Sequence, residues 1–68
     1  MQQYEIHIGK DAKERRTYPC LQVSDHAAIR RAVSLARNFE EVEVWRAEVC
    51  VYARAAQAAQ PGNAYGKI

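Results

Sequence analysis

The sequence predicts a two-layer α+β domain, in which one amphipathic helix packs on one face of a small, mainly antiparallel sheet. The predicted order is β-β-α-β-β within a single domain over residues 1–54. Apolar residues alternate with period two over residues 3–8, recur at helical spacing over residues 24–38, and alternate again over residues 41–54. Residues 55–68 are first Ala- and Gln-rich and then without pattern, which predicts an extension and a mobile C-terminal tail.

The first strand is predicted from the segment QYEIHI. Tyr4, Ile6 and Ile8 fall on one face and Glu5 and His7 on the other, as in a strand that is buried on one side. Gly9 ends the alternation, and the charged segment after it is expected to form a long hairpin loop.

The second strand is predicted over residues 17–23. Pro19 has no N–H to donate to a neighbouring strand, so this strand is expected at an edge of the sheet. Leu21 and Val23 are expected to point inward near its end.

The helix is predicted from the segment SDHAAIRRAVSLARN. Ser24 is expected to cap the first turn, where the negative charge of Asp25 interacts favourably with the helix dipole. Asn38 is expected to adopt the left-handed conformation after the last turn. Arg37 is expected in that last turn. The apolar stripe predicted to face the sheet comprises Ala28, Ile29, Ala32, Val33, Leu35 and Ala36.

Two strands joined by a turn are predicted over residues 41–46 and 49–54. Val42 and Val44 share one parity, whereas Val49 and Val51 share the other, so one continuous strand would send side chains to the wrong face. A turn at residues 46–48 removes this conflict. The alternative is a helix over residues 46–60, because the run of Ala and Gln favours helix and Pro61 follows it.

The Ala-rich helix followed by the segment VEVW resembles a family of small uncharacterised bacterial proteins with a β-β-α-β-β layout. The resemblance covers roughly residues 4–54. It implies the fold and a bacterial origin, and it carries over no functional residue.

A chain of 68 residues buries a small core, so its stability as a monomer is expected to be low. Ala supplies much of the apolar fraction, and Phe, Trp and Met occur once each, so a homodimer that extends the core is expected. The net charge of +2 divides into +3 over residues 1–37 and −1 over residues 38–68. Two Cys without a signal peptide or an apolar span predict a reduced, cytoplasmic protein that does not enter a membrane.

No spacing typical of catalysis or of metal binding is present. The candidate metal ligands His7, Cys20, His26 and Cys50 lack the close pairs of structural zinc sites, so we expect no metal. A Cys20–Cys50 disulfide requires neighbouring strands and an oxidising compartment, and a nucleophilic Cys20 requires a base such as His26.

The remaining patterns likewise give no enzyme signature. The acidic segment EEVE at residues 40–43 is interpreted as a solvated edge of the sheet, and the three Gly are isolated rather than grouped in a phosphate loop. We therefore predict a protein that is not an enzyme and needs no cofactor.

Two surfaces remain as candidate binding sites. The first is the uncovered sheet face around Trp45, where Tyr52, Glu43 and His7 are expected to join it in an interface with a second copy or with another protein. The second is the basic helix face, with possible help from the loop cations at residues 10–16; its predicted members are His26, Arg30, Arg31 and Arg37. The leading hypothesis is a non-enzymatic interaction module that self-associates or binds another protein through a sheet face or edge. Weak nucleic-acid binding by the basic helix face is the alternative.

Overall fold

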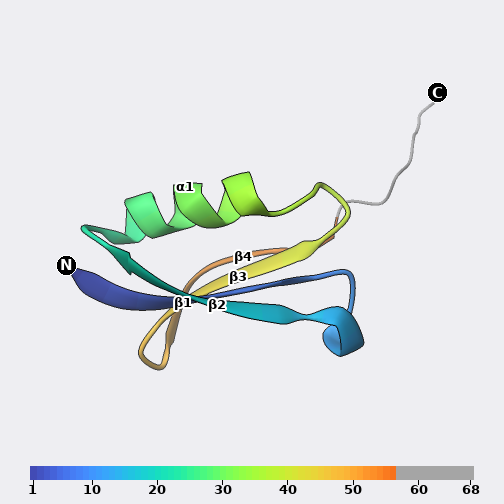
Figure 1. The fold of residues 1–68 in the computed structure, drawn as a ribbon, viewed down its shortest axis with the longest axis horizontal. Coiled ribbons are helices and arrows are strands. Elements are labelled where there is room, and N and C mark those ends of the chain that lie inside the picture. The colour runs from blue at the N-terminus through green and yellow to red at the C-terminus, as the bar shows by residue number, and fades with distance from the viewer. Residues whose placement is uncertain (57–68) are drawn as a thin grey trace.

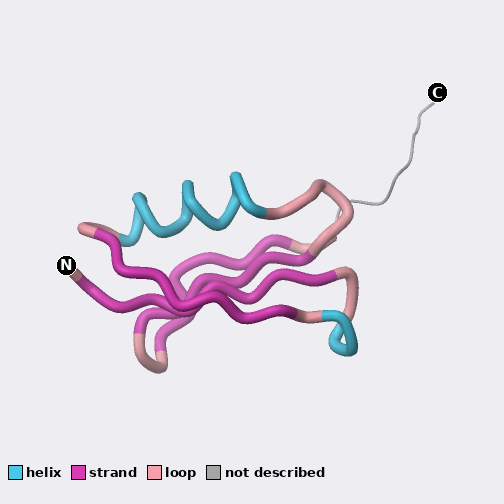
Figure 2. Tube along the Cα trace, in the orientation of Figure 1, coloured by secondary structure: helices cyan, strands magenta, loops and turns pink. Residues whose placement is uncertain are grey.

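The computed structural model describes residues 1–56 and confirms the predicted α+β fold class (Figure 1). The elements are β1 (Gln2–Gly9), the short 3-10 helix η1 (Ala12–Glu14), β2 (Arg16–Gln22), α1 (Asp25–Leu35), β3 (Glu41–Arg46) and β4 (Val49–Arg54). All neighbouring strands are antiparallel, in the order β2-β1-β3-β4. Helix α1 forms the second layer along one face of the sheet (Figure 2). Of the predicted extension and C-terminal tail over residues 55–68, residues 57–68 lie outside the described residues.

Strand β1 supplies the centre of the core, as its alternation predicts. Tyr4, Ile6 and Ile8 are fully buried under α1, and β1 is hydrogen-bonded to β2 on one side and to β3 on the other. The predicted hairpin loop is confirmed, with η1 inside it. Gly9 leaves no room for a side chain, because a Cβ there would lie 2.6 Å from the Cα of Arg15.

Strand β2 confirms the edge position predicted from Pro19 but reverses the predicted direction of its apolar residues. Tyr18 lies opposite Ile6 and faces the core, so residues of the other parity face away. Leu21 is 59% exposed and Val23 is 70% exposed, and the prediction that they point inward is wrong. The physical reason is that pairing with β1 fixes the register, and β1 buries its even-numbered residues.

Helix α1 begins as predicted, but it is rotated about its axis relative to the predicted stripe. The Ser24 hydroxyl accepts a hydrogen bond from the Ala27 N–H, which confirms the N-cap. Ala28 and Ala32 are fully buried, and Ile29 and Ala36 pack against the core as predicted. The prediction is wrong for Val33 and Leu35, which are 40% and 41% exposed. The small methyl groups of Ala28 and Ala32 let the helix approach the sheet closely, and the strands supply the large side chains of the core.

The expected end of the helix is also wrong. The helix stops at Leu35, with Ala36 as an extended C-cap, so Arg37 lies beyond the last turn. Asn38 does not adopt the left-handed conformation, which among the described non-glycine residues occurs at Ala47 only. The buried Glu40 holds this segment in place of a left-handed cap, as described below.

The β3–β4 hairpin is confirmed, and a helix is excluded for residues 49–54. Ala47 and Glu48 form the turn, and Ala47 has a φ of 53°. The register shifts between Val44 and Trp45, because Val44 pairs with Tyr52 and Trp45 pairs with Cys50. This bulge is how β3 and β4 accommodate the parity difference seen in the sequence.

The turn predicts a stabilising substitution. Ala47→Gly should raise the free energy of unfolding by about 0.5–1 kcal/mol, because a left-handed residue with a Cβ is strained and glycine is not. Glu48→Gly is the matched control, and it should lower stability by about 0.4–1 kcal/mol because its φ is not positive. Urea unfolding of the three proteins measures both changes. Equal destabilisation by the two glycines would contradict the assigned turn.

Candidate functional site

The face of the sheet that points away from α1, called the open face here, carries a polar cluster from three strands. His7 lies opposite Thr17 in β2 and opposite Glu43 in β3. Its Nε2 lies 3.2 Å from Oε1 of Glu5, and its Nδ1 lies 3.4 Å from the Thr17 hydroxyl. The half-buried His7 is thus held by side chains on both sides.

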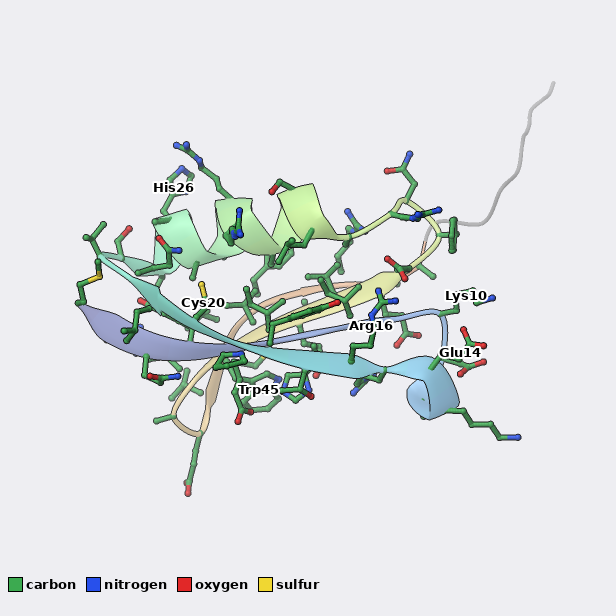
Figure 3. All side chains as sticks on the ribbon, in the orientation of Figure 1. Lys10, Glu14, Arg16, Cys20, His26 and Trp45 are labelled. Atoms are coloured by element: carbon green, nitrogen blue, oxygen red, sulfur yellow. The ribbon has the colours of Figure 1, made fainter. Side chains whose placement is uncertain are left out.

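Trp45 belongs to the open face and is half-buried. In Figure 3 its side chain lies on the side of the sheet away from α1. Its indole Nε1 donates to Oε1 of Glu43 at 3.0 Å, and Arg15 contacts Glu43 at 3.6 Å and Glu41 at 3.1 Å. The polar end of the tryptophan therefore has a partner within the chain, and only part of its ring is open to contact.

Of the four residues predicted for a protein interface, three lie together on the open face. His7, Glu43 and Trp45 share the open face, but Tyr52 pairs with Val44 and packs against the core on the helix side. The bulge in β4 causes this separation, because it changes the parity between Cys50 and Tyr52.

The second surface is a groove of about 560 Å³ along the outer side of α1, called the basic groove here. Its lining residues are Gln22, Ser24, His26, Ala27, Arg30, Arg31 and Ser34. Three of the four residues predicted for a basic helix face therefore lie together. Arg37 does not line the groove, since it follows the helix end and its backbone N–H donates to Glu40.

The loop cations do not join this groove. Lys10 and Arg16 lie toward the loop end of the sheet in Figure 3, whereas His26 lies near the start of α1. Arg15 is paired with glutamates of the open face, and Arg16 donates to Glu40 at 2.9 Å. The suggestion that these cations extend the basic face is wrong.

A cluster at the start of α1 was not predicted from the sequence. The Tyr4 hydroxyl donates to Oδ1 of Asp25 at 2.5 Å, and Arg46 donates to both carboxylate oxygens at 2.6 and 2.5 Å. The hydrogen bonds from Arg46 and then from Tyr4 lower the pKa of Asp25, and the hydrogen bond to Asp25 raises the pKa of Tyr4. Because the three residues come from α1, β1 and β3, they fix the start of the helix over the centre of the sheet.

A second polar cluster holds the end of the helix. Glu40 is only 6% exposed, so the prediction of a solvated acidic edge is wrong for this residue. It accepts from the Arg37 N–H and from Arg16, and the Arg37 N–H is the main cause of its lowered pKa. Arg54 donates to the carbonyls of Arg37 and Glu40, which ties β4 to the same segment.

The cysteines lie apart. Cys20 is on β2 and Cys50 is on β4, at opposite edges of the sheet, and both are free thiols. Cys20 packs against the core, whereas His26 lines the groove outside the helix. Within residues 1–56, no group of three or more His, Cys, Asp or Glu is arranged to hold a metal ion. The helices of the described part are too short and too polar to cross a membrane.

Comparison with protein-family models, with curated proteins and with solved structures found no match. Functional inference therefore depends on the geometry of these surfaces.

The two carboxylates with lowered pKa values predict acid sensitivity. Their folded-state pKa values lie below those of the unfolded chain, so their contribution to stability is complete above the ordinary carboxyl range near pH 4. It is lost as the pH falls through the folded-state values. Asp25→Asn should melt several degrees lower at neutral pH and lose less stability on acidification.

Thermal melts between neutral pH and pH 2 measure this effect. Glu48→Gln is the control, since Glu48 is an exposed turn residue without an ion pair among the described residues. It should retain the acid response of the parent protein. An Asp25→Asn variant with that same response would show that the cluster contributes nothing to stability.

Proposed function

We propose that this chain is a small binding module that self-associates through the free edge of β4, so that the β4 strands of two copies pair in one continuous sheet. The observation that carries the proposal is the difference between the two edges of the sheet. An edge strand exposes unpaired backbone N–H and C=O groups, and proteins usually protect such edges with Pro or charged side chains.

Strand β2 is protected in this way. Pro19 lies in the middle of the strand and has no N–H to donate to an incoming strand. Strand β4 has a bulge and ends at the charged Arg54, but its residues 49–53, VCVYA, contain no proline and no charged side chain. The β4 edge is therefore the one that accepts another strand.

The position of α1 also favours pairing at the β4 edge. The helix packs mainly on β1, β2 and β3, and β4 lies at the margin of the core. Val51 and Tyr52 are half-buried at this margin. A second copy paired at β4 would cover these side chains and enlarge a core in which residues 1–56 supply five large, fully buried side chains.

Charge argues against association through two open faces. The open face presents Glu5, Glu41 and Glu43, and Arg15 pairs with the last two. Two such faces in contact would bring like charges together, and partly desolvated like charges repel strongly. Pairing at the β4 edge avoids this contact.

Two added lysines test the proposal. Cys50→Lys with Ala53→Lys places charge on two exposed positions of β4 and should weaken self-association at least about tenfold, because like charges lie across the new strand pair. Thr17→Lys with Leu21→Lys adds the same charge to exposed positions of β2 and should leave association unchanged.

Sedimentation equilibrium over a range of protein concentrations measures association, and thermal melts confirm that each variant folds. The proposal predicts a dimer for the parent protein and for the β2 variant. A parent protein that stays monomeric throughout, or equal weakening by both variants, would overturn it.

A further inference from the structure

We propose that the basic groove binds phosphate groups of a nucleic-acid backbone, with Arg30 and Arg31 as the principal contacts. The groove lies on the outer side of α1, where His26 is seen in Figure 3. This inference goes beyond self-association, because it assigns a ligand to a surface that β4 pairing does not use.

Arg30 and Arg31 differ from the arginines that are held by partners within the chain, one of which, Arg54, donates to backbone carbonyls. Arg15, Arg16 and Arg46 each contact a carboxylate. Within residues 1–56, Arg30 and Arg31 make no ion pair and no side-chain hydrogen bond, although they are adjacent and both line the groove. Their planar guanidinium groups are free to donate two parallel hydrogen bonds each, which is the geometry that phosphate oxygens accept.

The nearest acidic residue of the helix does not neutralise them. Asp25 lies in the first turn, but both of its oxygens accept from Arg46 and one also accepts from Tyr4. The polar cluster that fixes the helix therefore also removes the competing anion. The groove retains its positive charge for a ligand.

Hydroxyl groups at the groove add hydrogen-bond capacity. The Ser24 oxygen accepts from the Ala27 N–H, which leaves its own O–H available to donate. The Ser34 hydroxyl donates to the carbonyl of Arg31 and keeps its acceptor capacity. Ser24 is thus the third donor that we expect to reach a phosphate.

The length and lining of the groove define the ligand class. Ten helical steps from Ser24 to Ser34 span about 15 Å, which is long enough for more than one phosphate. Among residues 1–56, no Phe, Tyr or Trp lines the groove, and His26 contributes the one ring on which a base could stack. Contacts to phosphates alone give binding that is weak, independent of base sequence and sensitive to salt.

Fluorescence anisotropy with a labelled oligo(dT) of about 10 nucleotides tests the proposal. Neutralisation of two phosphates of a single strand predicts a slope of about −1.4 for the logarithm of the binding constant against the logarithm of salt concentration. Arg30→Gln with Arg31→Gln should weaken binding at least about tenfold at low salt.

The matched control is Lys10→Gln with Lys13→Gln. It removes the same charge from exposed residues of the β1–β2 loop, neither of which lines the groove, and should leave binding within about twofold of the parent protein. No binding at low salt, or equal losses for the two double variants, would overturn the proposal, since equal losses indicate net charge alone.

Inorganic phosphate, added at constant ionic strength, distinguishes a free phosphate ligand from a nucleic-acid backbone. The proposal predicts that it competes poorly, because one phosphate fills only part of the groove. Strong displacement of the oligonucleotide by inorganic phosphate would assign the groove to a small anion and contradict the backbone assignment. Sedimentation of the same variants keeps this test separate from that of the β4 edge.

Discussion

The close contact between two helix alanines and the sheet is the constraint on which the rest of this structure depends. Ala28 and Ala32 are fully buried against strands that supply the large, fully buried side chains of residues 1–56. One helix is about 10 Å wide, whereas four strands about 4.8 Å apart form a wider sheet, so α1 covers β1, β2 and β3 and leaves β4 at the margin. The polar cluster centred on Asp25 and the buried Glu40 hold its two ends.

The limited cover by one helix accounts for the binding surfaces that remain. The sheet face away from α1 satisfies its polar groups internally, as the contact of Trp45 with Glu43 shows. Strand β4 is left at the margin, where its edge, which carries no charged side chain over residues 49–53, has no neighbour among the described residues. The outer side of α1 keeps Arg30 and Arg31 without partners, because Asp25 is engaged with the sheet. One packing arrangement thus leaves an edge suited to a strand and a groove suited to an anion.

The sequence predicted the positions of the helix and strands, because these follow from local patterns. It did not predict how the elements face one another, because that depends on packing between residues far apart in the chain. Period-two alternation and the Ser24 cap located the elements, and the parity conflict in residues 42–51 located the last turn. The rotation of α1, which exposes Val33, depends on the space left by the strands. The position of Tyr52 depends on a bulge that has no local sequence signal. The Asp25 cluster joins residues 21 positions apart on each side, which no local pattern reveals.

Backbone amide hydrogen exchange, measured residue by residue at low and at high protein concentration, tests most directly whether α1 leaves β4 as an open pairing edge. Exchange reports opening of individual hydrogen bonds, and strand pairing between copies protects amides in proportion to the dimer formed. The account predicts that the β4 amides that face away from β3 become protected as concentration rises, whereas those of the β2 edge do not change. Protection that rises along β2, or exchange that is independent of concentration in both strands, would contradict it.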